Sequence, residues 1–542
     1  MTARANELLT CLFVFIFLCF SSSSVAAEVK KTRPVPARIT PAIMPLWSDG
    51  PVGKELGFGI VDRAGAILLS TGEYNHIHIK QILSAARRHG WTLKELSTNS
   101  VAKKMAAILG AGLVVVGRLS PGGDDGFKLS LMIEDLRTSK SKHTEILLPK
   151  DIAASVVEGS MAVASLVASI DSVSVPRSDN AHPDCDLSKA MSAYLACASV
   201  LIEQPMGLRK SHTVNPARLK GARKKCEMAV KFDPHFGAAW ALLSLTHSMA
   251  LDGEQAAKAL VQANKTRGYL PFDTLASYWL ATRFGSSAKG AEVLRDAVGK
   301  YPGALIFRTY LGEHLNITHK YSNALDVWES YLDIVPHSPY AIAQKAYSLA
   351  RLGKLNEAIS LTRKAVEMDK DSLELKLELA SRLVDAGDLK EAERILLPLA
   401  GHARVYGELL LRLGYIYLLE KKDTKAEKWF NKALDLAKGP NEWRTRGRTH
   451  YDLAIVYVRK GKLTEAERHL LDAAKEGFLM RDILKTNPEL QVLANRSKVR
   501  HLFHNPDLKL KSNIFSTSPF PLNDAGGVEP DAKRTAITGF TF

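Results

Sequence analysis

The sequence predicts a small α/β (α+β) amino-terminal domain followed by an α-solenoid of about eight helix pairs. Three observations lead to this expectation. Small and bulky residues recur with a period of about 34 residues, each period holds two amphipathic apolar patterns, and helix and strand patterns mix before the repeats begin. With 542 residues, the chain is also too long for one ordinary core, so two or more units are expected.

Small residues mark the repeat most clearly. Gly414 has counterparts at whole multiples of the period, namely Ser244, Gly312, Ala346 and Ala380, with Tyr278 as a bulky exception. Ala426 and the bulky Phe430 recur in the same frame, at Ala256, Ala324, Ala358 and Ala392 and at Leu260, Leu294 and Trp328. Small residues let two helices approach closely and the bulky residue fills the space between them, so each period predicts a packed helix pair. Glycines at 353, 387 and 461 then fall in the turn between the helices, where a left-handed backbone is cheap for glycine.

This pattern resembles that of tetratricopeptide repeat (TPR) proteins. The resemblance covers residues 185–480 and implies about eight TPR helix pairs. Tyr278 and Gly290 depart from the small residues of the pattern, and Leu399 replaces a later alanine. A solenoid needs a polar terminal cap, so we expect residues 481–504 to form capping helices. Residues 505–542 are rich in Pro, Gly, Ser and Asp, which predicts a disordered tail.

Residues 40–172 combine several helix patterns with shorter apolar strand patterns, which favours a compact α/β or α+β domain. The runs "GLVVVGRLS" and "FKLSLMIEDL" are joined by "PGGDDG", a strong hairpin signal. This region resembles envelope domains such as the TolB amino-terminal domain and the CsgG-like group. The resemblance implies an assembly or adaptor role at the bacterial envelope, without catalysis.

The start of the chain predicts its compartment. The apolar run "CLFVFIFLCF", followed by small residues, indicates a signal peptide over residues 1–27, with cleavage after Ala27. A periplasmic or secreted location follows. In the alternative, the segment is retained and anchors the chain in a membrane, and only then do we expect membrane association. Residues 28–39 and 173–184 are interpreted as linkers.

Cleavage would leave three cysteines, Cys185, Cys197 and Cys226. An exported protein can oxidise one pair and keep one thiol over. A Cys197–Cys226 bridge is one expectation, and buried free thiols are the other.

The common catalytic signatures are missing. The sequence contains no phosphate-binding loop, zinc-protease or nucleophile-elbow motif, so we expect no enzyme, no cofactor and no metal. The run "GGDDG" at 122–126 is interpreted as a turn and not as a nucleotide-cyclase signature. His76 and His78 have the spacing of metal ligands on one strand face, but no cysteine or carboxylate stands near them in sequence. We expect both histidines to face solvent.

In a TPR array, the first helix of each pair lines the concave surface. By register this selects Trp279, Glu313, Tyr347 and Tyr415, then Tyr340 from an earlier position and Arg283, Asn316 and Arg351 one turn later. Aromatic and arginine side chains are common anchors in peptide recognition, so these residues form the predicted partner-binding set. Burial in contacts between repeats is the alternative role for several of them.

The resulting hypothesis is an exported, non-enzymatic scaffold or adaptor. It would bind protein or peptide partners along the concave TPR surface, within a bacterial cell-envelope assembly. The alternative is binding of anionic glycan or lipid head groups through a basic surface, because the formal net charge is +16 and the pI about 9.4. Nucleic acid is not an expected partner.

Overall fold

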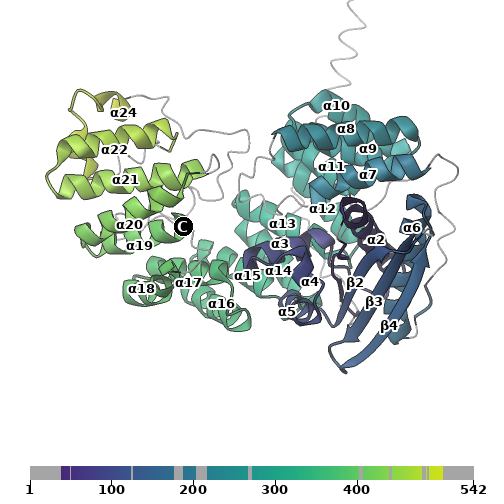
Figure 1. The fold of residues 1–542 in the computed structure, drawn as a ribbon. Helices are drawn as coiled ribbons and strands as arrows, with labels where there is room; N and C mark the ends of the chain where they lie inside the picture. The colour runs from purple at the N-terminus through teal and green to yellow at the C-terminus, as the bar shows by residue number, and fades with distance from the viewer. Residues whose placement is uncertain are drawn as a thin grey trace, which may run out of the picture. The chain divides into compact units, whose positions relative to one another are not determined.

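The computed structural model in Figure 1 describes residues 38–48, 50–123, 126–171, 173–175, 187–202, 216–265, 272–401, 407–438, 442–478, 484 and 487–504. The predicted signal peptide, nearly all of both predicted linkers, Cys185 and the predicted tail lie outside the described residues. So do the two aspartates of the "GGDDG" turn. These predictions therefore stay predictions.

Four strands form one sheet near the start of the described chain, in the order β1-β2-β3-β4. They span Pro41–Ile43, Leu113–Pro121, Phe127–Asp135 and Lys140–Leu148. Strand β1 runs parallel to β2, while β2 with β3 and β3 with β4 are antiparallel. Pro121 pairs with Phe127 across the predicted hairpin turn, which confirms the hairpin. Buried and half-buried residues alternate along β3, as a sheet covered on one face requires.

Helices α2 (Pro51–Ser70) and α6 (Ile152–Asp171) cover one face of this sheet and pack side by side (Figure 1). Among the described helices, α6 is the one that is long and apolar enough to cross a membrane. Half of its apolar window is buried inside the fold, as expected of a core helix. Helices α3 (Ile79–His89), α4 (Leu93–Leu96) and α5 (Asn99–Leu109) precede β2. A small α/β unit is therefore present, as predicted.

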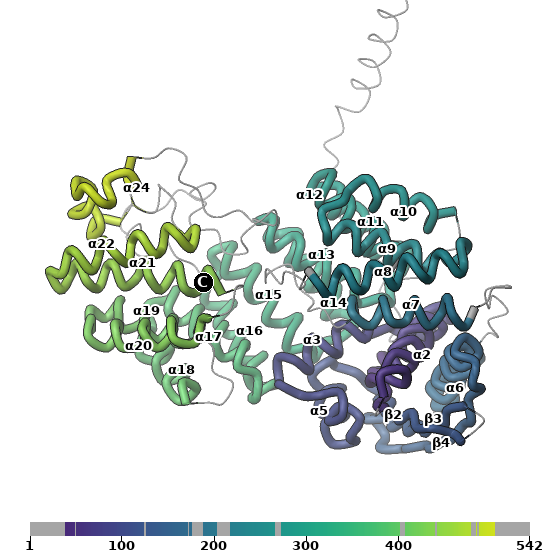
Figure 2. Tube along the Cα trace, turned by 45° about the horizontal axis from the view of Figure 1, so that its top comes forward, coloured from purple at the N-terminus to yellow at the C-terminus, as the bar shows by residue number. Residues whose placement is uncertain are grey.

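Sixteen helices follow in eight antiparallel pairs within the described part of the chain (Figure 2). The first helices of the pairs are α7 (Leu187–Ile202), α9 (Gly237–Met249), α11 (Phe272–Leu280), α13 (Leu305–Ile317), α15 (Pro339–Arg351), α17 (Leu373–Asp385), α19 (Gly407–Leu419) and α21 (Trp443–Arg459). The second helices are α8 (Pro216–Phe232), α10 (Gly253–Lys265), α12 (Ser287–Lys300), α14 (Tyr321–Ile334), α16 (Leu355–Met368), α18 (Leu389–Leu396), α20 (Asp423–Leu436) and α22 (Leu463–Lys475). The predicted α-solenoid of about eight pairs is confirmed.

Small and bulky residues meet inside the pairs as the period predicts. A Cβ atom on Gly414 would lie 2.5 Å from the ring of Phe430, and one on Gly312 would lie 2.5 Å from the ring of Trp328. In the exceptional pair, a Cβ on Gly290 of α12 would lie 2.0 Å from Thr282 Oγ1 and 3.4 Å from the ring of Tyr278 on α11. The glycine therefore leaves room for Thr282, and the Tyr278 ring lies at ordinary contact distance beside it.

The turns between paired helices adopt left-handed backbone at one fixed position. The three predicted glycines, 353, 387 and 461, have φ values of 82°, 83° and 71°. Three other pairs place Leu251, His319 and Lys421 at the same step of the period, with φ values of 66°, 60° and 59°. The turn geometry is thus set by the packing of the two helices, and glycine makes it cheaper without being required.

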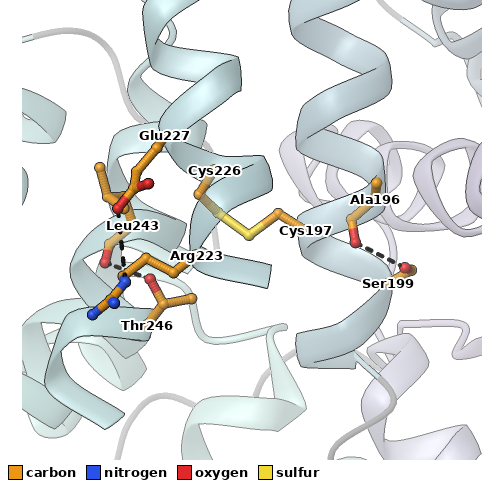
Figure 3. The surroundings of a disulfide bond; sticks show 8 residues. All are labelled: Ala196, Cys197, Ser199, Arg223, Cys226, Glu227, Leu243 and Thr246. Atoms are coloured by element: carbon orange, nitrogen blue, oxygen red, sulfur yellow. Dashed lines mark hydrogen bonds and ion pairs between the residues drawn. A yellow bond between two sulfur atoms is a disulfide. The ribbon is translucent and has the colours of Figure 1, made fainter. Parts of the chain in front are cut away.

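Cys197 on α7 and Cys226 on α8 form a disulfide bond, with their Cα atoms 5.5 Å apart (Figure 3). Both cysteines are fully buried. The bond joins the two helices of the first pair, and the Arg223–Glu227 ion pair of α8 lies nearby, beside Leu243 and Thr246 of α9. This outcome matches one of the two expectations for these cysteines.

The α/β unit and the first repeats share one continuous hydrophobic core. That core runs from Ala42 in β1 to Ala341 in α15, and a second core covers Leu373 to Phe503. At its end, the second core is closed by the short helices η5 (Leu490–Leu493) and α24 (Arg500–His504). Residues 481–504 are the predicted capping helices, and their described part contains these two short helices.

Candidate protein-binding surface

Helix α3 of the α/β unit lies across the first helices of the middle repeats. Gln81 Nε2 donates a hydrogen bond to Thr309 Oγ1 on α13, at 3.2 Å. The Arg88 guanidinium stands over the ring of Tyr340 on α15, 5.1 Å from its centroid. Tyr340 is one of the predicted partner-binding residues, and in this structure its ring already has an intramolecular cation–π partner. Sequence reasoning missed this contact.

The end of α3 continues onto the next repeat. His89 forms a buried ion pair with Asp369, in the turn before α17, at 2.9 Å between Nε2 and Oδ2. Arg88 Nε also lies 3.6 Å from Glu374 Oε2, on α17 itself. At the other end of α3, buried Lys80 donates to the carbonyl oxygen of Leu201 on α7. Burial lowers the pKa of Lys80 to about 7.

Glu313 and Asn316, two predicted partner-binding residues on α13, are buried in contacts with α15. The Tyr340 hydroxyl donates to Glu313 Oε1. The Ser348 hydroxyl donates to Asn316 Oδ1 at 2.8 Å. Their exposed fractions are 5% and 1%. For these two residues, the structure shows the inter-repeat role that was the alternative expectation.

Trp279 and Arg283 lie next to each other at the end of α11. The Arg283 guanidinium is 5.7 Å from the Trp279 ring centroid, and both side chains are partly buried. Arg283 belongs to a π-helical turn, Ala281–Gly285, that interrupts the end of the first helix. Burial lowers the pKa of Arg283 to about 10. The structure therefore brings these two predicted residues into contact with each other. Both lie earlier in the chain than the other predicted partner-binding residues.

Tyr347 and Tyr415 take part in a regular arrangement that sequence reasoning did not find. The Arg382 guanidinium stands 5.4 Å from the Tyr347 ring centroid, so α17 stacks on α15. The Arg448 guanidinium stands 4.9 Å from the Tyr415 ring centroid, so α21 stacks on α19. Each tyrosine of one first helix is thus covered by an arginine of the next.

Arginines occur on four successive first helices, and we call them the arginine row: Arg351, Arg382, Arg412 and Arg448, on α15, α17, α19 and α21. Arg351 Nε donates to the Tyr321 hydroxyl at 3.1 Å, and the Arg412 guanidinium donates to the Ser381 hydroxyl on α17. These arginines stand at different positions within the period of about 34 residues. Comparing equivalent positions of the repeats therefore selects Arg351 and not the other three.

Carboxylates compensate the arginine row. Arg382 pairs with Glu378 at 2.9 Å and with Asp385 at 3.3 Å. Burial raises the pKa of Asp385, while the neighbouring arginines of the row oppose that shift. Burial likewise raises the pKa of Asp452, the partner of Arg448, to about 6. The row is therefore a ladder of charged and aromatic groups packed between successive first helices. Most of its members are buried, with exposed fractions of 3% for Tyr347, 6% for Tyr415, 1% for Arg382 and 5% for Arg412.

His76 and His78 contradict the expectation that they face solvent. Their exposed fractions are 7% and 0%. His78 Nε2 lies 2.7 Å from Asp62 Oδ1 on α2, so a carboxylate distant in sequence is its partner. Burial lowers the pKa of His76 to about 3. Both histidines are packing residues between α2 and the strand–helix turn before α3.

Comparisons with known proteins agree with the repeat architecture. Sequence models of the tetratricopeptide repeat match residues 349–406 and 405–475. The chain therefore contains tetratricopeptide repeats, which are protein-interaction scaffolds. No catalytic family is among these matches, and a search of curated proteins found no match to the chain.

Solved structures with a related arrangement of helices share little sequence with this chain. A tetratricopeptide repeat protein from Parabacteroides merdae ATCC 43184 is 14% identical over 48% of this chain and 99% of its own, with a TM-score of 0.40. Yeast Tom70 is 14% identical over 58% of this chain and 66% of its own, with a TM-score of 0.43. YrrB, described as a TPR protein with an unusual peptide-binding site, is 17% identical over 34% and 93%, with a TM-score of 0.26.

Proposed function

We propose that the chain is an exported, non-enzymatic scaffold that binds a protein partner along the first helices of its carboxy-terminal repeats, in a bacterial cell-envelope assembly. The arginine row carries this proposal. It coincides with the segment that matches the tetratricopeptide repeat, and it sets guanidinium donors beside tyrosine rings, a combination enriched at protein-binding hot spots. The contacts of α3 described above run from α13 to the start of α17. Helices α19 and α21 are therefore the part of this surface proposed for the partner.

Export is supported by two independent features. The apolar run before Ala27 has the composition of a secretory signal. The Cys197–Cys226 disulfide is a bond that persists in oxidising compartments and is rare in the cytosol. The TolB- and CsgG-like resemblance of residues 40–172 supports a place at the bacterial envelope.

The experiment uses the full-length chain, because a truncation after the α/β unit would cut through a shared core. A photo-crosslinking amino acid replaces Glu408, a partly buried residue on α19, and as a control Lys390, an exposed residue on the second helix α18. We expect a defined protein to be captured from position 408 and not from position 390. Arg448→Lys keeps a cation beside Asp452 but loses the planar guanidinium over Tyr415, so it should weaken that capture while the protein stays folded. Equal capture at both positions, or capture unaffected by Arg448→Lys in a folded protein, would refute the proposal.

A second candidate, binding of anionic lipid head groups, is favoured by one specific surface on α8. Lysines at 220, 224 and 231 share a stripe with Met228, and all four side chains are exposed. Met228 is 42% exposed and nearby Phe232 is 39% exposed, so two large apolar side chains lie beside the lysines. Basic and apolar side chains on one helix face suit a membrane interface.

Vesicle co-sedimentation tests the second candidate. The full-length mature chain should bind vesicles containing phosphatidylglycerol and not pure phosphatidylcholine vesicles, and binding should fall as salt is raised. Lys220→Glu with Lys224→Glu should abolish it, whereas Lys354→Glu with Lys364→Glu, two exposed lysines elsewhere, should not. Equal loss in both double variants would show that net charge alone is responsible. Binding to an anionic glycan and not to vesicles would assign the α8 surface to glycans.

A further inference from the structure

The last helix pair brings two histidines and an aspartate together. Nδ1 of His450 on α21 lies 3.0 Å from Nδ1 of His469 on α22. With Asp472, one ligand atom from each residue lies within 4.8 Å of the other two. We propose that these three residues form a binding site for a divalent transition-metal ion of the zinc class, which would join α21 to α22.

Helix geometry accounts for the cluster. His469 and Asp472 are three residues apart on α22, so their side chains share one face of the helix. That face packs against α21, which supplies His450 from the other side. The ring of Tyr457 stacks on His469, with centroids 5.1 Å apart and planes 5° from parallel, and holds the imidazole in place. The packing of α21 against α22 therefore fixes the positions of two of the three candidate ligands, His450 and His469.

The spacing of the nitrogens fits a metal. Zinc binds imidazole nitrogen at about 2.0–2.1 Å, so two nitrogens on a tetrahedral ion stand about 3.3 Å apart. The observed 3.0 Å is close to that value. Two imidazoles and one carboxylate form a common zinc ligand set, and the fourth position is then open to water. Without a metal, the same contact requires one proton shared between the two nitrogens, and the experiment must separate these states.

Two side-chain cations contact the proposed ligand residues, one at a ligand atom and one at the other ring nitrogen of His469. Lys475 Nζ lies 2.9 Å from Asp472 Oδ1. Arg468 lies 3.2 Å from Nε2 of His469, which must carry a proton when Nδ1 ligates a metal. Both cationic side chains are exposed and able to swing into solvent. Removing the Lys475 ammonium, which contacts a ligand atom, should therefore tighten metal binding.

Isothermal titration of the metal-free, full-length mature chain with Zn²⁺ tests the proposal. We expect one equivalent to bind, and Co²⁺ in its place to give the visible absorption of a tetrahedral site. His450→Gln should weaken Zn²⁺ binding at least tenfold. His143→Gln, which removes an exposed histidine from β4, should leave it unchanged. Lys475→Gln should bind Zn²⁺ more tightly than the unaltered chain.

The same measurements define what would overturn the site. Absence of one-equivalent Zn²⁺ binding, or binding that His450→Gln and His143→Gln weaken equally, would leave the contact as a hydrogen bond between two histidines. If His450→Gln does not fold, as judged by circular dichroism without metal, Asp472→Asn serves instead, because this side chain is 30% exposed. Zn²⁺ binding unaffected by Asp472→Asn in a folded protein would then refute the proposed ligand set.

Discussion

His89 and Asp369, separated by 280 residues in sequence, form a buried ion pair between the α/β unit and the repeat array. Nε2 of His89 lies 2.9 Å from one carboxylate oxygen and 3.0 Å from the other. Nδ1 lies 2.9 Å from the carbonyl oxygen of Ala85, and Trp91 stacks on the imidazole ring. Both ring nitrogens thus lie within hydrogen-bonding distance of oxygen atoms. This pair fastens α3 to the start of α17.

Breaking this ion pair is expected to cost much stability. Asp369→Asn and His89→Gln should each lower the free energy of unfolding by about 3 kcal/mol, because each leaves a buried polar group without its counterpart. The double variant should lose clearly less than the sum of the two. Urea unfolding followed by circular dichroism measures all three values. Glu374→Gln is the control, since the Arg88–Glu374 contact is longer and more exposed, and it should cost under about 0.5 kcal/mol.

Close packing at Gly414 gives a second prediction. Gly414→Ala should destabilise the protein by about 1–3 kcal/mol, because the new Cβ would stand 2.5 Å from the Phe430 ring. Adding Phe430→Leu should recover part of the loss, since leucine occupies the same step of the period in other pairs. Gly299→Ala is the matched control, as no atom lies within 4 Å of its Cβ position on α12. A loss equal to that of Gly414→Ala would contradict the packing argument.

The repeat array was predictable because its information is local and periodic. A small residue and its bulky partner lie about 16 positions apart in one pair, as Gly414 and Phe430 do. Because this spacing recurs from period to period, the contact can be recognised from the sequence. The glycine at position 290 is explained by the close approach of Thr282, which the period does not predict. The hairpin between β2 and β3 was predictable for the same reason, since its turn and both strands are contiguous.

The contacts of the candidate surface could not be predicted in the same way. Arg382, Arg412 and Arg448 occupy different steps of the period, so no repeat register selects them. The contact of Arg88 with Tyr340 joins segments about 250 residues apart, and the sequence of neither segment indicates that it contacts the other. The burial of His76 and His78 was missed because their covering elements, α2 and the later repeats, come together only in the folded chain.

The disulfide gives a third prediction. Reducing Cys197–Cys226 should lower the free energy of unfolding by about 3 kcal/mol, because the bond closes a loop with a sequence separation of 29. Urea unfolding with and without dithiothreitol measures the difference. The variant with both cysteines replaced by serine should show no response to the reductant. A response in that variant would mean that another group is being reduced.

His314 gives a prediction about pH. Nδ1 of His314 accepts from the Tyr278 hydroxyl at 3.1 Å, and Nε2 lies 2.9 Å from the carbonyl oxygen of Ser287, so the imidazole is held neutral. Burial lowers its pKa from 6.5 to about 4. Below about pH 6.5 the unfolded chain therefore binds a proton that the folded chain does not, and stability falls as the pH drops toward 4.

The difference between the unaltered chain and His314→Gln isolates this effect. At about 1.4 kcal/mol per pH unit, the advantage of the unaltered chain in free energy of unfolding should shrink by about 3 kcal/mol between pH 6.5 and pH 4. Buried His76 titrates in the same direction, with a pKa lowered to about 3, but it is present in both proteins and cancels. Urea unfolding at half-unit pH steps gives the difference directly. A difference that stays constant over this range would show that His314 takes up a proton equally in the folded and unfolded chain.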